Sequence, residues 1–412
     1  MNVKNYDYEE LSELLDEWSV DVSHIGATVY PGSSPSGVFR SYKEDRVTLP
    51  KGEDATSSQE EESIHQSISS TGQRITKTLS GTQRFNLSEV LGEGTFGRVW
   101  RADDNDLNRR VAIKGFKGPI EQAKTSCISE LKYVGGLDHP SIPTVYDTGL
   151  TEDGVPFVVM KFIDGESLTH IIDRLRSGDA ETHRHFSFER RVGLIISLLK
   201  ATQSAHDQGV LHRDIKPDNI LVSSDGHLWL IDWGCAVSIE DVKESSGLSG
   251  TPLYMPPEQV LKGSLSVASD LFAIASVAYE FLSLHRAGPP TTQVKETLKA
   301  ILTHQPKLLY EMSHPTQGYV PAEYSGVIMQ ALERSPARRP KSANEMIRWF
   351  ERQLSGDIEI VCARTLLKSR LCRLMTWVNQ DPYPRMRYIK FTVVGITLMM
   401  MGIGALAASL LL

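Results

Sequence analysis

The stretch that decides the fold is His212-Arg213-Asp214-Ile215-Lys216-Pro217-Asp218-Asn219, because one short loop supplies three groups for chemistry on an anion. Asp214 can accept a proton from an attacking hydroxyl, and Lys216 can neutralise a phosphoryl group as it moves. Asn219 lies five residues after Asp214 and can hold a magnesium ion. The loop therefore predicts a site that handles a phosphoryl group and a metal ion together.

A second acidic turn, Asp232-Trp233-Gly234, lies 18 residues after Asp214 and directly after the apolar run 228–231. A carboxylate that leaves a buried strand at a glycine turn can bridge magnesium and the phosphates of a nucleotide. We therefore expect Asp232 and Asn219 to be the metal ligands.

Upstream, Leu91-Gly92-Glu93-Gly94-Thr95-Phe96-Gly97-Arg98-Val99 falls between two expected strands. Its glycines let backbone amides approach phosphates closely. Alone, the stretch is also compatible with an ordinary hairpin turn, and a dinucleotide fingerprint would need a helix where a strand follows. Seventeen residues after Gly97, Val111-Ala112-Ile113-Lys114 places a lysine in an apolar strand, where its ammonium group needs anionic partners.

In this order and spacing, over residues 85–352, the motifs resemble the eukaryotic-like (Hanks-type) serine/threonine protein kinases, bacterial type. The resemblance implies an α+β, bilobal protein kinase fold. A small β-rich N-lobe with one main helix would cover about 81–163, and a larger helical C-lobe about 164–354. The residue pattern agrees, with short strands before residue 163 and helix-period apolar faces after Gly165. Strands are expected at 90–91, 98–102, 111–114, 144–147 and 157–162, and helices at 120–134, 192–205, 268–284, 324–333 and 343–354.

By the same resemblance, Lys114 forms an ion pair with Glu130, which lies nine residues before His139-Pro140 on the next expected helix. Glu121 is the rival carboxylate, but it lies near the start of that helix. The backbone of Met160-Lys161-Phe162-Ile163 would bind the adenine edge, with Met160 in the gatekeeper position. The full set expected to contact ATP is Leu91, Gly92, Gly94, Gly97, Val99, Ala112, Lys114, Met160, Phe162, Ile163, Leu221 and Asp232.

The stretch Gly250-Thr251-Pro252-Leu253-Tyr254-Met255-Pro256-Pro257-Glu258 resembles the end of a kinase activation segment. Thr251 would hydrogen-bond toward Asp214 and Lys216, which is typical of Ser/Thr-directed members. Supporting roles are implied for Glu258, which would pair with Arg339, and for Asp270, which would cap the backbone around His212 and Arg213.

The activation segment also carries Ser245, Ser246 and Ser249. We expect Ser245 or Ser246 to be the activating phosphorylation site, because Arg213 beside the base can pair with a phosphate on that loop. The Trp233 position usually holds Phe, which leaves open how its ring packs between Val134 and His212.

The segments before and after residues 81–354 differ from them in composition. Residues 1–80 account for the net charge of −7, because they hold 7 Lys/Arg against 14 Asp/Glu. This charge gives no indication of nucleic-acid binding, so no nucleic-acid partner is expected. This acidic, Ser/Thr-rich segment is expected to be disordered. Four scattered cysteines favour a reducing compartment over disulfides or structural zinc.

Residues 391–412 are 22 uncharged residues, about 33 Å as a helix and enough to cross a bilayer. The preceding linker, 355–390, is basic, which predicts a single-pass C-terminal anchor with a cytoplasmic kinase domain. The linker is either a basic amphipathic helix on anionic lipid or a helix packed on the domain. Gly404 and Ala408 have a spacing that permits pairing of two spans in a homodimer.

These patterns predict an ATP- and Mg2+-dependent kinase, with Mn2+ as an allowed substitute, that phosphorylates Ser/Thr of protein substrates and itself in membrane-anchored signalling. The alternative is a weakly catalytic pseudokinase that acts as a tethered nucleotide-binding scaffold. Such a scaffold usually lacks one of the three key side chains, and Lys114, Asp214 and Asp232 are all present.

Overall fold

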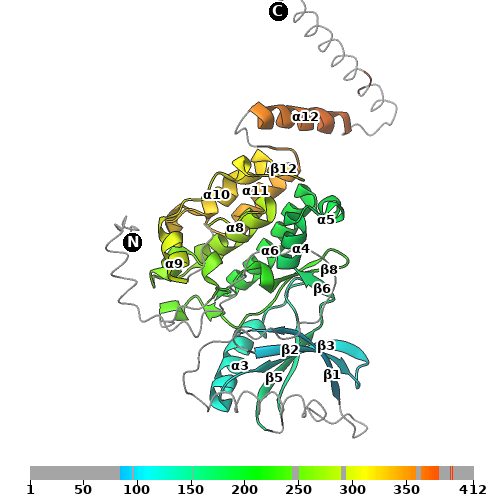
Figure 1. Cartoon of the computed structure of the whole chain (residues 1–412), viewed down its shortest axis with the longest axis vertical. Coiled ribbons are helices and arrows are strands. Elements are labelled where there is room, and N and C mark those ends of the chain that lie inside the picture. The colour runs from blue at the N-terminus through cyan, green and yellow to red at the C-terminus, as the bar shows by residue number, and fades with distance from the viewer. Residues whose placement is uncertain are drawn as a thin grey trace, which may run out of the picture.

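The structure is a computed structural model, and two lobes are evident in it, a β-sheet lobe at one end and a helical lobe at the other (Figure 1). The residues that it describes are 84–94, 97–151, 153–243, 250–288, 294–358, 363–379, 390 and 392. The expected disordered segment 1–80 and the serines Ser245, Ser246 and Ser249 lie outside these ranges, as does 391–412 apart from Thr392.

The N-lobe is a five-stranded antiparallel sheet in the order β1-β2-β3-β5-β4. Its strands are β1 (Phe85–Glu93), β2 (Gly97–Asp104), β3 (Arg109–Phe116), β4 (Val145–Leu150) and β5 (Pro156–Lys161). Helix α3 (Ile120–Val134) covers one face and packs Ala123 and Cys127 against Phe116 and Val158. The last six residues of β3 are all buried, and among them only Lys114 is charged.

Gly97 shows why the glycine-rich stretch tolerates no larger residue where β2 begins. A Cβ at this position would collide with the carbonyl oxygen of Gly115 on the adjacent strand β3. The close approach keeps the β2–β3 pair in register, so that Val99 lies opposite Lys114.

The C-lobe is built around the long helices α6 (Phe188–Asp207) and α8 (Val267–Ser283), whose apolar faces share one large core. The side chain of Ser187 caps α6, and Ser266 and Ser269 form a capping box at the start of α8. The other helices are α4 (Leu168–Arg176), α5 (Ala180–His185), α7 (Pro257–Val260), α9 (Val294–Thr303), α10 (Ser325–Ala331) and α11 (Ala343–Leu354).

The C-lobe also contains short strands and 3-10 turns, and those nearest the other lobe hold the loops of the site. The three-stranded sheet β6-β8-β9 and the pair β10-β7 carry these loops. The strands are β6 (Gly165–Ser167), β7 (Val210–Leu211), β8 (Ile220–Ser223), β9 (Leu228–Leu230), β10 (Val237–Ser238), β11 (Ser313–His314) and β12 (Gly318–Tyr319). The 3-10 turns are η2 (Pro217–Asn219), η3 (Asp241–Lys243), η4 (Pro252–Tyr254), η5 (Leu309–Glu311), η6 (Ala322–Tyr324) and η7 (Pro336–Arg338).

The expected helices at 120–134, 192–205, 268–284 and 343–354 are confirmed within a few residues, whereas the expected helix at 324–333 is shorter, at 325–331. Helices α4, α5, α7 and α9 were not expected from the sequence. Among the described residues, no helix has the length and apolar character needed to cross a membrane.

The linker contains a helix, α12 (Ala363–Asn379), which lies at the end of the C-lobe farthest from the sheet (Figure 1). An ion pair from Lys368 to Glu323 on η6 attaches it to the domain. The linker therefore contains the predicted helix, and one side of that helix packs on the domain.

Candidate active site

Lys114 is the buried cation at the junction of the two lobes. Strand β3 carries it inward, and its Nζ lies 2.7 Å from Glu130 Oε2 on α3 and 2.8 Å from Asp232 Oδ1 of the C-lobe. Burial alone would lower the pKa of Lys114, but the carboxylates of Asp232 and Glu130 outweigh it and raise that pKa, so the amine stays charged. The rival carboxylate, Glu121, is exposed and pairs with Lys124 instead.

Asp232 is held ionised beside this cation. Burial favours its neutral form, but Lys114 outweighs that effect and lowers the pKa of Asp232 to about 2. Its backbone is in the left-handed region, with φ of 59°, and so is Arg213, with φ of 68°. Such conformations are costly for residues with a side chain and persist where the surroundings enforce them, which is common at functional sites.

The loop after β7 brings Asp214, Lys216 and Asn219 together. Lys216 Nζ lies 2.8 Å from Asp214 Oδ2, and Asn219 Nδ2 donates to the Asp214 backbone oxygen at 2.8 Å and to Oδ2 at 3.2 Å. Burial opposes the charge on Lys216, but Asp214 and, more weakly, Asp232 raise the pKa of Lys216. The carboxylates of Asp214 and Asp232 therefore both act on the Lys216 amine, so these two carboxylates share one electrostatic environment.

The end of the activation segment docks on this loop as the sequence predicted. The Thr251 amide donates to Asp214 Oδ1 at 2.8 Å, and Lys216 Nζ donates to Thr251 Oγ1 at 2.8 Å. Gly250 has a φ of +113°, and a Cβ there would lie 2.9 Å from the Arg213 carbonyl oxygen. Only glycine therefore combines this conformation with this close approach.

Trp233 resolves the question of how a larger ring fits in place of Phe. Its side chain is buried in the C-lobe core together with Val134 of α3, and its ring centroid lies 4.5 Å from that of His212. The indole N–H donates to the Leu230 carbonyl oxygen at 3.4 Å, so the added polar group has a partner. Burial lowers the pKa of His212, which favours the neutral imidazole.

Two buried carboxylates, Asp270 and Glu258, fix the backbone segments that carry the site residues. Asp270 accepts the backbone amides of His212 and Arg213, each at 3.0 Å. Glu258 forms a two-pronged ion pair with Arg339, at 2.7 and 2.8 Å, behind the activation segment. Both predicted contacts are present.

The residues expected around adenine occupy adjacent positions on the sheet and the hinge. Ala112 is buried and pairs with Met160 across β3 and β5, and Phe162 and Ile163 follow directly after β5. Val99 and Leu221 are partly buried, whereas Leu91 and Gly92 at the end of β1 and Gly94 directly after it are exposed. A Cβ at Gly92 or Gly94 would meet no atom within 4 Å, so there the backbone borders open space.

The donor set suits magnesium. Asp232 and the side-chain oxygen of Asn219 are hard oxygen ligands, and Mg2+ is usually held by one or two such groups together with substrate phosphates and water. Within the described ranges, no group of three or more His, Cys, Asp or Glu side chains could form a protein-only metal site. The two predicted ligands therefore fit a magnesium ion that is shared with a nucleotide.

The sequence did not reveal one part of the site, the anchoring of Tyr254. Its hydroxyl donates to Glu280 Oε2 at 2.6 Å, and Arg176 Nη2 lies 2.9 Å from Glu280 Oε1. Glu280 is buried on α8, and burial together with this carboxylate raises the pKa of Tyr254 well above its usual value. The available signal was a lone Glu in the apolar run of 267–283.

Comparison with known proteins agrees with this geometry. The protein kinase domain family matches residues 85–350, and the chain belongs to this family. It is 28% identical over 320 residues to the serine/threonine-protein kinase PknB of Mycobacterium tuberculosis, which covers 74% of this chain and 49% of PknB. It is 31% identical to PknA of the same species, over 65% of this chain and 60% of PknA.

A probable serine/threonine-protein kinase of Streptomyces coelicolor, SCO3848, is 30% identical over 66% of this chain and 40% of its own length. The chain therefore spans about half the length of the curated relatives that it matches.

Proposed function

We propose that this chain is a protein kinase that transfers the γ-phosphoryl group of ATP to Ser/Thr hydroxyls of proteins. Two amine–carboxylate contacts support the proposal most strongly. Lys114 Nζ lies 2.8 Å from Asp232 Oδ1, and Lys216 Nζ lies 2.8 Å from Asp214 Oδ2. Phosphoryl transfer needs positive charge and positioning more than covalent chemistry, and these groups supply both.

In this proposal Asp214 orients the attacking hydroxyl and accepts its proton. The Thr251 amide and Asn219 hold the carboxylate in place, and Lys216 beside it neutralises the moving phosphoryl group. Asn219 and Asp232 would hold Mg2+, which neutralises phosphate charge when bound. Lys114, fixed by Glu130, would hold the nucleotide phosphates.

Preference for Ser/Thr over Tyr is supported by Thr251. Its hydroxyl accepts a hydrogen bond from Lys216 and its amide donates to the base, so the end of the activation segment lies against the reacting groups.

We further propose that phosphorylation of Ser245 or Ser246 orders the activation segment through Arg213. Arg213 lies directly before Asp214, so a phosphate bound there would act on the base through the shared backbone. Residues 391–412 are proposed to anchor the chain in a membrane, on the basis of their uncharged sequence and the basic residues before them.

The test is incubation of the purified chain and its Asp214→Asn variant with radiolabelled ATP and Mg2+, followed by mapping of phosphorylated residues. We expect label on protein serines or threonines, including Ser245 or Ser246, with the native chain alone. Binding of ATP without transfer by either protein would support the scaffold alternative instead. An unaltered rate in the double variant Ser245→Ala/Ser246→Ala would refute the activating role of these serines.

A further inference from the structure

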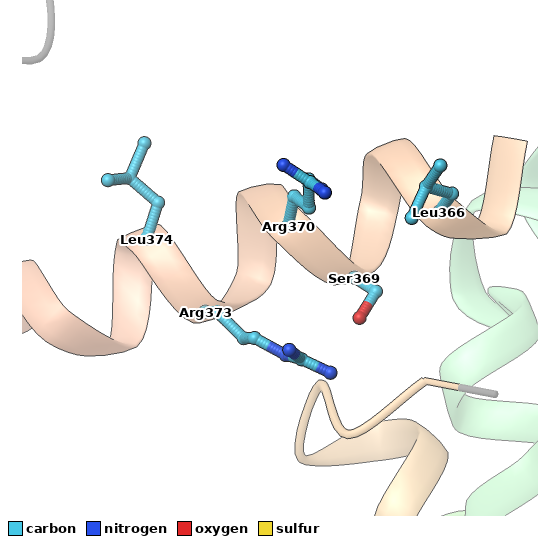
Figure 2. A pocket seen from close by; sticks show the side chains of 5 residues that line it. All are labelled: Leu366, Ser369, Arg370, Arg373 and Leu374. Carbon is cyan, nitrogen blue, oxygen red and sulfur yellow. The ribbon is translucent and has the colours of Figure 1, made fainter. Parts of the chain in front are cut away.

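Helix α12 exposes its large apolar side chains. Leu366, Leu367, Leu371 and Trp377 are 38%, 71%, 51% and 49% exposed, respectively. Figure 2 shows Leu366 and Leu374 on the side of the helix that points away from the rest of the chain, with Arg370 between them. Clustered apolar exposure of this kind marks a surface that contacts another apolar medium.

The opposite side of α12, which packs on the C-lobe, is small and polar. Thr365 and Ser369 are buried there, each 1% exposed, and Lys368 pairs with Glu323. Gly356 allows the close contact with Cys372, because a Cβ at 356 would lie 2.8 Å from the Cys372 Cβ. An amphipathic surface helix normally turns its apolar stripe toward the core, so the polarity of α12 is the reverse of the usual one.

Positive charge accompanies the exposed apolar residues. Arg370 lies on their side of the helix, and Arg373, which points to the side of Ser369, is exposed as well (Figure 2). Residues 363–379 contain no Asp or Glu. The chain returns to α12 at Lys390, whose Nζ lies 4.3 Å from the centre of the Trp377 ring and donates to the Trp377 carbonyl oxygen at 3.2 Å. Lys390 directly precedes the uncharged stretch 391–412 in the sequence.

We infer that α12 is a membrane-surface helix that inserts its leucines and Trp377 among acyl chains while its arginines bind anionic headgroups. Basic residues combined with Leu and Trp on the outer face are the composition of interfacial helices. Because α12 lies at the end of the C-lobe farthest from the sheet, the bilayer would contact that end and leave the junction of the two lobes on the far side from the membrane (Figure 1). This inference goes beyond phosphoryl transfer and does not require 391–412 to span the membrane.

The test separates α12 from the proposed span by using the full chain with Val394→Asp/Met400→Asp, which places two negative charges in the uncharged stretch and adds no attraction to anionic lipid. Flotation is measured with vesicles of neutral phosphatidylcholine and with vesicles that contain 30% phosphatidylglycerol. We expect binding to the anionic vesicles alone. Adding Arg370→Gln/Arg373→Gln should weaken that binding about 30-fold, at roughly fivefold per charge near an anionic surface.

A matched control, Arg338→Gln/Lys341→Gln, removes two exposed charges elsewhere on the C-lobe and should bind within about twofold of its parent. Adding Leu367→Ser/Leu371→Ser instead tests the apolar face, and it should also release the chain from anionic vesicles. Binding to neither vesicle, equal binding to both, or equal binding by the arginine variant and the control would overturn the inference. Phosphoryl transfer measured on the same proteins tests the proposed activity separately, because neither result depends on the other.

Discussion

The ion pair between Glu258 and Arg339 allows a quantitative test of how the activation segment is held. The Arg339 side chain is fully buried, and besides Glu258 it donates to the carbonyl oxygens of Glu333, Ala268 and Arg334 at 2.7–3.0 Å. Glu258 also accepts the Ser269 hydroxyl at 2.8 Å. Arg339→Met would therefore leave a buried carboxylate with only one hydroxyl partner, and such a loss costs about 3–5 kcal/mol.

The double-mutant cycle adds Glu258→Gln and the combined variant. Glu258→Gln leaves a buried cation and should also cost about 3 kcal/mol, whereas the pair together should cost much less than the sum, because no isolated charge remains. The assay is urea unfolding followed by circular dichroism, with phosphoryl transfer as a second readout. Single losses below about 1 kcal/mol, or simple additivity, would refute the view that this pair fixes the segment.

The pKa of His212 is lowered in the fold, so below about pH 6.5 the unfolded chain takes up a proton on this residue that the folded chain does not. The free energy of unfolding of the native sequence should therefore fall by up to about 1.4 kcal/mol per pH unit there, and His212→Phe should flatten this dependence. The same change in the free energy of unfolding from pH 7.5 to 5.5 in both proteins, measured by urea unfolding, would contradict this. Trp233→Phe should cost about 1–2 kcal/mol through the lost bond to Leu230 and the smaller ring, and no loss would argue against that packing. Thr251→Ala should lower kcat about tenfold by removing the partner of Lys216, whereas Thr251→Ser should restore it.

Much of the site could be predicted because its chemistry is carried by side chains in local motifs. Glu130 was expected from the spacing that the kinase family shows before His139-Pro140, and Glu121 was set aside because it lies near the helix start. The structure brings Glu130 to Lys114 while Glu121 stays exposed. The supporting pairs of Glu258 and Asp270 were likewise expected. The strands were found because β-branched runs alternate with Gly or polar turns.

The rest depended on contacts between segments that are far apart in sequence. The second partner of Lys114, Asp232, lies 118 residues away, and the role of Glu280 depends on where Tyr254 docks. The orientation of α12 could not be predicted either, because apolar periodicity identifies a helix but does not say which face meets the domain. There the usual inward placement of apolar residues does not hold, since Leu367 and Leu371 point outward.

The central claim is that Asp214 is the base for phosphoryl transfer. Measuring both Mg·ATP affinity and turnover on the native chain and on Asp214→Asn tests it most directly. Asp214 accepts hydrogen bonds from Thr251 and Asn219 and holds no predicted contact with adenine, so ATP affinity should change less than about threefold. Turnover should fall about a hundredfold to ten-thousandfold, which is the usual contribution of a general base. Turnover within about tenfold of the native value, with ATP binding intact, would contradict the assignment of Asp214 as the base.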